Sequence, residues 1–191
     1  MYKNFCERII FLVRSFTGKV GAISISSRYL INKVTSLIDG PLDTIVEYGG
    51  GTGVMTKKLL QKLSPEGKLI VIESDPRFVK ILRKIADSRL QIIEGPIQNQ
   101  ILDASHGFSS IDLVVSSIPF SFLTSFQQQK LISDTEKILT EKGSFILFHQ
   151  YRKVTLKPLR KKFEKVSVFF EPRNVFPSFI LQAEKTTKQD C

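Results

Sequence analysis

Short apolar runs alternate with segments of helical apolar spacing along most of this chain. Runs of β-branched and large apolar residues predict strands at 44–46, 68–72, 90–94, 112–116, 144–150, 166–170 and 179–183. Apolar residues three and four apart predict helices at 28–38, 54–63, 77–86, 120–139 and 158–165, the last with Pro158 at its start. This alternation predicts an α/β fold with a doubly wound, mainly parallel sheet.

The first segment, residues 2–16, places an apolar stripe opposite a polar, partly cationic side. Phe5 and Phe16 belong to the stripe, and Lys3 and Arg14 to the other side. Two interpretations stay open, because such a helix can pack on the folded domain or lie in the interface of an anionic membrane.

The length of 191 residues fits one domain with a sizeable core. We therefore expect residues 1–191 to form a single domain. Within it, residues 1–40 would be a helical segment and residues 41–191 the core, because Gly40 and Pro41 end the second helix.

A glycine-rich turn follows the first predicted strand and precedes a predicted helix. Glu47 stands two residues before the first of the glycines Gly49, Gly51 and Gly53, and Glu73 ends the next predicted strand. Glycines let backbone approach a ligand closely, and an acid at the second strand end is placed to bind ribose hydroxyls. A carboxylate at position 47 disfavours a pyrophosphate and suits a cation. S-adenosylmethionine is thus the expected ligand, and a dinucleotide is the alternative.

The other strand ends complete the expected ligand site, because ligands of such sheets lie outside the carboxyl ends of the strands. On the cofactor side these positions are Ser74, Gly95, Pro96 and Ser116. Beyond them, Pro119 fixes the chain so that the carbonyls of Ser117 and Ile118 could face the site, and Phe120 is expected to form an apolar wall beside it.

Charge and cysteine content narrow the class of partner. The formal net charge is +10, which favours a polyanion, either nucleic acid or an anionic membrane face. Cys6 and Cys191 lack metal-ligand spacing, so free thiols in a reducing cytosol are expected. No apolar run long enough to span a membrane occurs in the sequence.

The motifs VEYGGGTG, ESDPRF and SSIPF resemble those of class I S-adenosylmethionine-dependent methyltransferases. Ribosomal RNA adenine dimethylases and bacterial phospholipid N-methyltransferases both fit. The resemblance to the lipid enzymes covers nearly the whole chain and includes VGAISISSRYL (20–30), FHQYR (148–152), LRKKF (159–163) and PRNVFPSFIL (172–181). The RNA enzymes carry Asn or Asp where this chain has Ser117, and an acid where it has Pro96.

The resemblance to the lipid enzymes implies a function and a site. The fold would be a seven-stranded Rossmann-like sheet with an N-terminal amphipathic helix. The reaction would be methylation of the phosphatidylethanolamine amine toward phosphatidylcholine, with S-adenosylmethionine as donor. The protein would be a monomer without a stable nucleic-acid partner, bound through residues 2–16 to the inner, cytoplasmic face of the membrane. The implied catalytic residues are Ser117, Ile118, His149 and Tyr151, and the implied phosphate-binding residues are Tyr151, Arg152 and Arg173.

Two other functions stay open at this stage. One is methylation of RNA adenine on the same fold. The other is a membrane-binding module that has lost catalysis, which the departures at Ser117 and Pro96 keep open.

Overall fold

A computed structural model describes residues 26–97, 100–101, 108, 110–150, 152–174 and 176–185. The expected membrane helix within residues 2–16 and the expected site residue Tyr151 lie outside the described residues.

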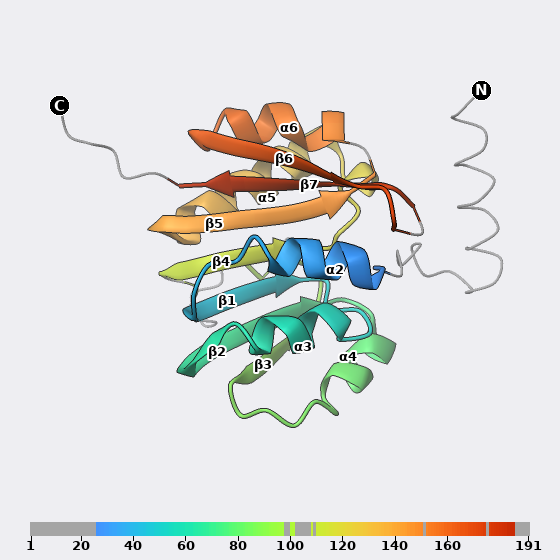
Figure 1. The fold of residues 1–191 in the computed structure, drawn as a ribbon, viewed down its shortest axis with the longest axis vertical. Helices are drawn as coiled ribbons and strands as arrows, with labels where there is room; N and C mark the ends of the chain where they lie inside the picture. The colour runs from blue at the N-terminus through green and yellow to red at the C-terminus, as the bar shows by residue number, and fades with distance from the viewer. Residues whose placement is uncertain are drawn as a thin grey trace.

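The described residues form a seven-stranded sheet in the order β3-β2-β1-β4-β5-β7-β6 (Figure 1). The strands are β1 Leu42–Tyr48, β2 Leu63–Glu73, β3 Leu90–Glu94, β4 Ile111–Ser116, β5 Leu139–His149, β6 Lys165–Glu171 and β7 Ser178–Glu184. Strands β1 to β5 pair in parallel, whereas β7 is antiparallel to both β5 and β6. β6 therefore runs in the direction of β5, and the carboxyl ends of β1 to β6 share one edge. The expected doubly wound, mainly parallel sheet is confirmed.

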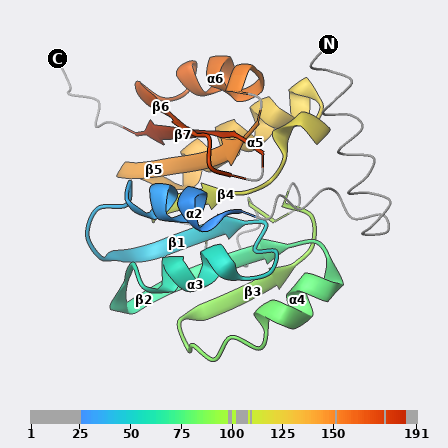
Figure 2. The same cartoon turned by 45° about the vertical axis from the view of Figure 1, so that its right-hand side comes forward.

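Helices cover both faces of the sheet (Figure 2). Their bounds are α2 Arg28–Thr35, α3 Val54–Leu60, α4 Pro76–Leu82, α5 Ser125–Ile138 and α6 Arg152–Arg160, with a 3₁₀ turn η3 at Phe120–Phe122. On one face, α2, α3 and α4 bury Leu30, Leu59 and Leu82 in a cluster with Ile45 and Val115 of the central strands. The opposite residues of the same strands form the second cluster, because side chains alternate along a strand. That second cluster joins Val46 and Val114 to Leu131 of α5 and Leu159 of α6.

Two helix predictions need correction. The predicted helix at 158–165 is wrong, because α6 is Arg152–Arg160 and Pro158 lies inside it. The prediction rests on the preference of proline for the first turn, where its missing N–H costs nothing. α6 instead starts soon after β5 ends and packs Leu156 and Leu159 against the core. The predicted helix at 120–139 is divided, because the capping box of Thr124 and Gln127 starts α5 at Ser125.

Residues 65–67, between the predicted helix at 54–63 and the predicted strand at 68–72, form an irregularity within β2. Leu42 pairs with Leu63, but Thr44 pairs with Lys68, so the residues between Leu63 and Lys68 interrupt the register. β5 repeats this feature, because Ile111 pairs with Leu139 and Leu113 pairs with Ser144.

The amino end of α2 is fixed to the turn between β6 and β7. The Ser27 hydroxyl caps α2 by accepting a hydrogen bond from the N–H of Leu30 at 3.3 Å. The N–H of Ser27 donates to Oδ1 of Asn174 at 2.8 Å, and Nδ2 of the buried Asn174 donates to the hydroxyl of Ser178 at 3.0 Å. The first described helix therefore begins at the sheet edge where β6 ends.

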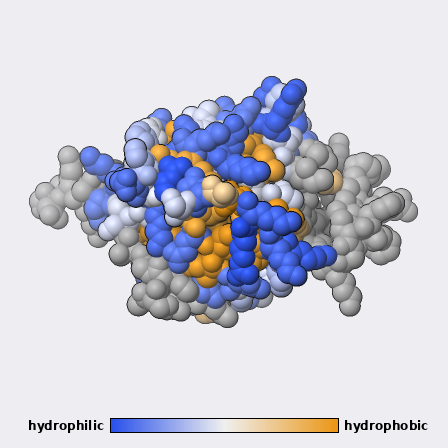
Figure 3. Space-filling view, turned by 90° about the horizontal axis from the view of Figure 1, so that it is seen from below, coloured by the Kyte–Doolittle hydropathy of each residue, from blue (hydrophilic) through white to orange (hydrophobic). Residues whose placement is uncertain are grey.

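The β3 side of the sheet exposes some apolar surface. Figure 3 views the molecule from this side and shows apolar atoms among hydrophilic ones. β3 is an edge strand, and its Leu90 and Ile92 are half-buried. Across the residues that the structure describes, no helix has both the length and the apolar composition needed to cross a membrane.

Candidate active site

The glycine-rich turn lies between β1 and α3, at the carboxyl edge of the sheet. The N–H of Gly49 donates to the carbonyl of Ile72 at 2.9 Å, which fixes the turn to the end of β2. Gly49 and Gly53 have φ values of 82° and 80°, a conformation that favours glycine. A side chain at Gly50 would lie 2.5 Å from Cγ1 of Val71, so the turn packs directly against β2. The sequence thus predicted both the place of this turn and its need for glycine.

Glu73 ends β2 and holds the glycine turn from the other side. Its Oε2 accepts a hydrogen bond from the N–H of Gly51, and its Oε1 accepts one from the N–H of Asp75, each at 2.9 Å. The side chain is 8% exposed, whereas the neighbouring Ser74 is exposed. An anchored carboxylate of this kind can accept further hydrogen bonds, since each oxygen has two lone pairs.

Glu47 is buried beneath the same turn, and one of its oxygens has no partner. Its Oε2 accepts a hydrogen bond of 2.6 Å from the hydroxyl of Thr56 on α3, whereas its Oε1 has no hydrogen-bond partner among the described residues. Burial raises the pKa of Glu47 to about 8, against the opposing effect of Thr56, and the nearby charge of Glu73 raises it further. A cation beside Oε1 would satisfy this oxygen and favour the ionised form.

The segment after β4 crosses over the glycine turn. The N–H of Ser117 donates to the carbonyl of Tyr48 at 3.0 Å, and its hydroxyl donates to the carbonyl of Gly49 at 2.6 Å. The buried Ser116 hydroxyl accepts the N–H of Ile118 at 3.3 Å. The carbonyls of Ser117 and Ile118 accept no hydrogen bond from another described residue. These two carbonyls can therefore accept hydrogen bonds from a ligand.

Gln128 supports this segment, and the sequence analysis missed it. Its Nε2 donates to the carbonyls of Phe120 and Leu123, at 2.8 and 2.9 Å. Gln128 is 8% exposed although it lies on α5. A glutamine at a core position of a helix was the available signal, because buried amides need such partners.

His149 and Phe120 pack together beneath the edge. Phe120 is fully buried in the core, so the expected apolar wall facing an open site is wrong. Its ring stacks on the imidazole of His149 at a centroid distance of 6.2 Å. His149 is itself buried, and its Nε2 lies 2.7 Å from the hydroxyl of Thr155 on α6. Desolvation lowers the pKa of His149 to about 4, so the imidazole is neutral at pH 7.

This burial predicts a pH dependence of stability. Between pH 6.5 and about 4 the unfolded chain binds a proton at His149 that the folded protein does not bind. The free energy of unfolding is therefore unaffected by the titration of His149 above pH 6.5 and falls as the pH falls toward 4. The loss is about 1.4 kcal/mol per pH unit, or a few kcal/mol in all. His149→Gln should flatten the free energy of unfolding measured by urea denaturation across this range. An unchanged slope would show that other groups cause the acid sensitivity.

Gly95 and Pro96 follow β3 with a glutamine amide packed against them. The N–H of Gly95 donates to the carbonyl of Glu73 at 2.9 Å, and Gly95 has a φ of 145°. A side chain there would meet Nε2 of Gln100 at 2.7 Å. Sequence reasoning missed Gln100, because only the fold brings it back over Gly95.

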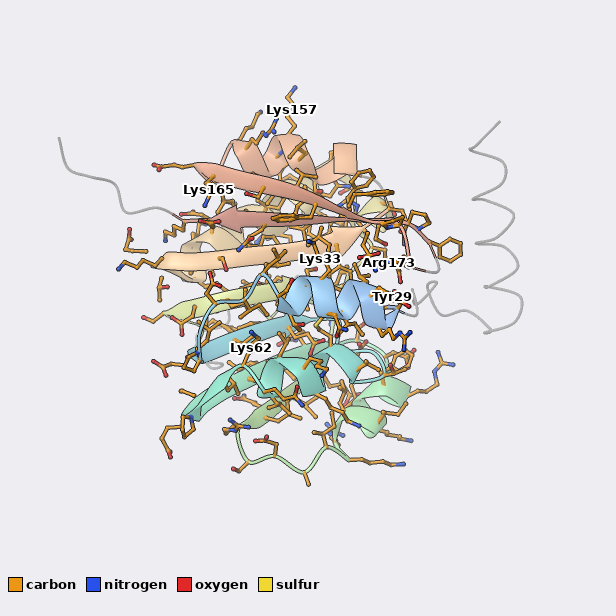
Figure 4. The ribbon with its side chains drawn as sticks, viewed as in Figure 1. Tyr29, Lys33, Lys62, Lys157, Lys165 and Arg173 are labelled. Atoms are coloured by element: carbon orange, nitrogen blue, oxygen red, sulfur yellow. The ribbon has the colours of Figure 1, made fainter. Side chains whose placement is uncertain are left out.

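The expected phosphate-binding residues are only partly described. Arg152 begins α6, at the same edge of the sheet. Arg173 follows β6 and pairs with Glu171, its Nε lying 2.8 Å from Oε1 of the carboxylate. Figure 4 shows Arg173 beside Tyr29 of α2, at the end toward which β1, β4 and β5 point.

Comparison with known proteins decides the family. A family model described as a methyltransferase domain matches residues 45–143, just over half of the chain. The chain is also 32% identical over 138 residues to an ornithine lipid N-methyltransferase of Singulisphaera acidiphila, covering 70% of this chain and 71% of that protein. The chain belongs to the class I S-adenosylmethionine-dependent methyltransferases. This confirms the expected S-adenosylmethionine-dependent methyltransferase and its methyl donor.

Other relatives of this methyltransferase differ in what they act on. It is 36% identical over 97 residues to a mitochondrial ribosomal RNA small subunit methyltransferase of Arabidopsis thaliana, which covers 50% of this chain and 24% of the relative. The N-methyltransferase NodS of Bradyrhizobium japonicum, solved with S-adenosyl-L-homocysteine, superposes with a TM-score of 0.69 at 15% identity over 92% of this chain and 96% of NodS. An O-methyltransferase of Thermotoga maritima gives 0.69 at 18% identity over 93% of this chain and 72% of that one. The two structures show the fold alone.

Proposed function

We propose that this methyltransferase methylates the head-group amine of a phospholipid, phosphatidylethanolamine or its mono- and dimethyl derivatives, toward phosphatidylcholine. The observation that carries the proposal is the 32% identity, across 70% of the chain, to an enzyme named for N-methylation of an amine lipid. The protein would work as a monomer on the cytoplasmic face of the membrane, with residues 2–16 on the anionic surface.

In this proposal the donor binds along the glycine turn, at the carboxyl edge of the sheet. The unpartnered Oε1 of Glu47 fits the cationic methionine end of the donor, and Glu73 fits the two ribose hydroxyls. The turn and the neighbouring strand ends would line the rest of the pocket. These lining residues are Gly49, Gly51, Gly53, Ser74, Gly95, Pro96 and Ser116. When bound, the donor supplies a methyl group made electrophilic by its sulfonium.

The chain must then deprotonate and orient the lipid amine. An alkylammonium has a lysine-like pKa of about 10 and no lone pair, so one proton must leave before the nitrogen attacks. The open carbonyls of Ser117 and Ile118 would accept the remaining N–H bonds and direct the lone pair. Desolvation of the amine would lower its pKa and favour the reactive form. The neutral His149, lying behind Phe120, would support this segment and could join Tyr151 in relaying the proton.

Transfer of a labelled methyl group tests the proposal. The full chain is incubated with labelled S-adenosylmethionine and anionic liposomes that contain phosphatidylethanolamine, and the lipids are separated by head group. Labelled mono-, di- or trimethylated phosphatidylethanolamine is the expected product. A folded, donor-binding protein that leaves the lipid unlabelled would refute it.

The alternative is methylation of adenine in RNA. The relative from Arabidopsis thaliana and the net charge of +10 favour it. The same assay with ribosomal RNA in place of liposomes separates the two, since label in RNA alone would establish the alternative.

A further inference from the structure

The ring of Tyr29 lies within 5 Å of two guanidinium groups. The Cζ atom of Arg28 is 4.9 Å from the ring centroid, and the Cζ atom of Arg173 is 4.6 Å from it. Arg28 also donates from Nη2 to the Tyr29 hydroxyl at 3.0 Å. We call these three residues the Tyr29 cluster. It joins the first described helix to the β6–β7 turn, so only the fold brings it together.

The Tyr29 cluster lies at the catalytic edge of the sheet. β6 runs parallel to β5, so Arg173 emerges where β1, β4 and β5 also end. Tyr29 reaches that edge because α2 packs across Ile45 and Val115 of the central strands and begins beside Asn174. Figure 1 shows α2 in front of β4, between β1 and β5, with the β6–β7 turn bending toward its start. The cluster therefore lies at the same edge of the sheet as the Ser117–Ile118 segment, on the face that α2 covers.

The Tyr29 cluster keeps positive charge and hydrogen-bond donors available. Glu171 occupies Nε and Nη2 of Arg173, but Nη1 bonds to no described residue, and the Arg173 side chain is 63% exposed. Arg28 is exposed and forms no ion pair within the described part of the chain. The Tyr29 hydroxyl accepts from Arg28 and can itself donate.

The carboxylate of Glu171 does not neutralise the cluster. Hydrogen bonds from the side chain and N–H of Arg173 lower the pKa of Glu171 to about 2, and the charge of Lys33 acts in the same direction. Lys33 lies on α2, with its Nζ 5.5 Å from the ring of Phe169. Two cations, Arg173 and Lys33, thus act on this one buried carboxylate, and Arg28 adds a further positive charge to the cluster.

We propose that the Tyr29 cluster binds the acidic group of the amine lipid, whether phosphodiester or carboxylate, and so selects zwitterionic amine lipids over amines that lack an acid. The inference rests on the proposed function and specifies its substrate class. Two guanidinium groups held against one ring form a preorganised fork for a phosphate or carboxylate oxygen. A phenol donor beside them would add a third hydrogen bond to the same anion.

The test compares amine lipids that carry a phosphodiester, a carboxylate or no acid. Methyl transfer is measured in mixed micelles of a neutral detergent, which removes the field of an anionic membrane. The acceptors are dioleoyl phosphatidylethanolamine, an ornithine lipid, and the 2-aminoethyl ether of dioleoylglycerol, which has the amine but no acid. The variants are Arg28→Gln, which breaks no ion pair, and Arg173→Lys, which keeps the charge beside Glu171. Lys165→Gln is the matched control, because Lys165 lies at the opposite end of β6.

The expected result is a change in selectivity. Arg28→Gln should lower kcat/KM for the acid-bearing lipid about tenfold, the usual scale of one charge-assisted hydrogen bond, and change that for the ether less than twofold. Donor affinity should stay unchanged, and Lys165→Gln should match the native enzyme. Of the two acid-bearing lipids, the one whose kcat/KM falls more in Arg28→Gln shows whether the cluster prefers a phosphodiester or a carboxylate. Equal losses on all three acceptors, or none, would overturn the inference alone. A native enzyme inactive on every amine lipid would overturn it together with the proposed function.

Discussion

Glu47→Gln should stabilise the ligand-free protein at pH 8 and weaken its binding of S-adenosylmethionine. The buried carboxyl keeps its proton up to about pH 8, whereas the unfolded chain loses that proton near pH 4.5. Stability therefore falls as the pH rises between these values, by an amount on the order of 5 kcal/mol, and the loss is complete above pH 8. Glutamine stays neutral and avoids this cost.

Two measurements check the Glu47 prediction. Urea denaturation at pH 5 and pH 8 should show a gain of a few kcal/mol that is largest at pH 8. Calorimetry should show donor affinity lowered about tenfold or more, because the charge opposite the donor's ammonium is gone. Glu66→Gln makes the same chemical change at an exposed position and should alter neither value. A variant that is less stable at both pH values would mean that the carboxylate is needed for folding.

Glu73→Ala should reduce donor affinity more than any other single change in the candidate pocket. Two ribose hydroxyls bound to a charged acceptor contribute about 1.5–3 kcal/mol each, so affinity should fall about a hundredfold to ten-thousandfold. The change also leaves the N–H groups of Gly51 and Asp75 without their acceptor. The glycine turn would then keep its bond from Gly49 to Ile72 but lose its bond from Gly51 to the end of β2.

Calorimetric titration with S-adenosyl-L-homocysteine measures this effect without turnover. Glu94→Ala is the matched control, because Glu94 ends the adjacent strand and its side chain is 42% exposed. Among the described residues, that side chain bonds to Arg83 alone. Glu94→Ala should bind the ligand like the native protein. An unchanged affinity in Glu73→Ala would remove Glu73 from the pocket.

Local sequence patterns predicted correctly the parts of the site that are built from residues close together in the chain. The spacing of Glu47, the glycines and Glu73 predicted a turn at the end of β1 and an acid at the end of β2, and both lie there. The reason is physical: positive φ values demand glycine, and parallel strands deliver their ends to one edge.

Features that depend on distant partners could not be predicted. The contact of Tyr29 with Arg173 joins residues from opposite ends of the chain, and the amide of Gln128 is meaningful only beneath the loop after β4. The prediction that Phe120 forms a wall of the ligand site is wrong, because Phe120 is buried in the cluster that includes residues of α5 and α6. The predicted start of α6 is wrong because it assigns Pro158 the most common helical position of proline, whereas Pro158 lies inside α6.

The bond between Ser27 and Asn174 has a consequence for how the protein is made. The two residues are 147 positions apart, so the β6–β7 hairpin leaves the ribosome well after α2. Until Asn174 has been synthesised, the N–H of Ser27 lacks its acceptor. A nascent chain can therefore contain the glycine turn while the amino end of α2 still lacks its bond to the hairpin.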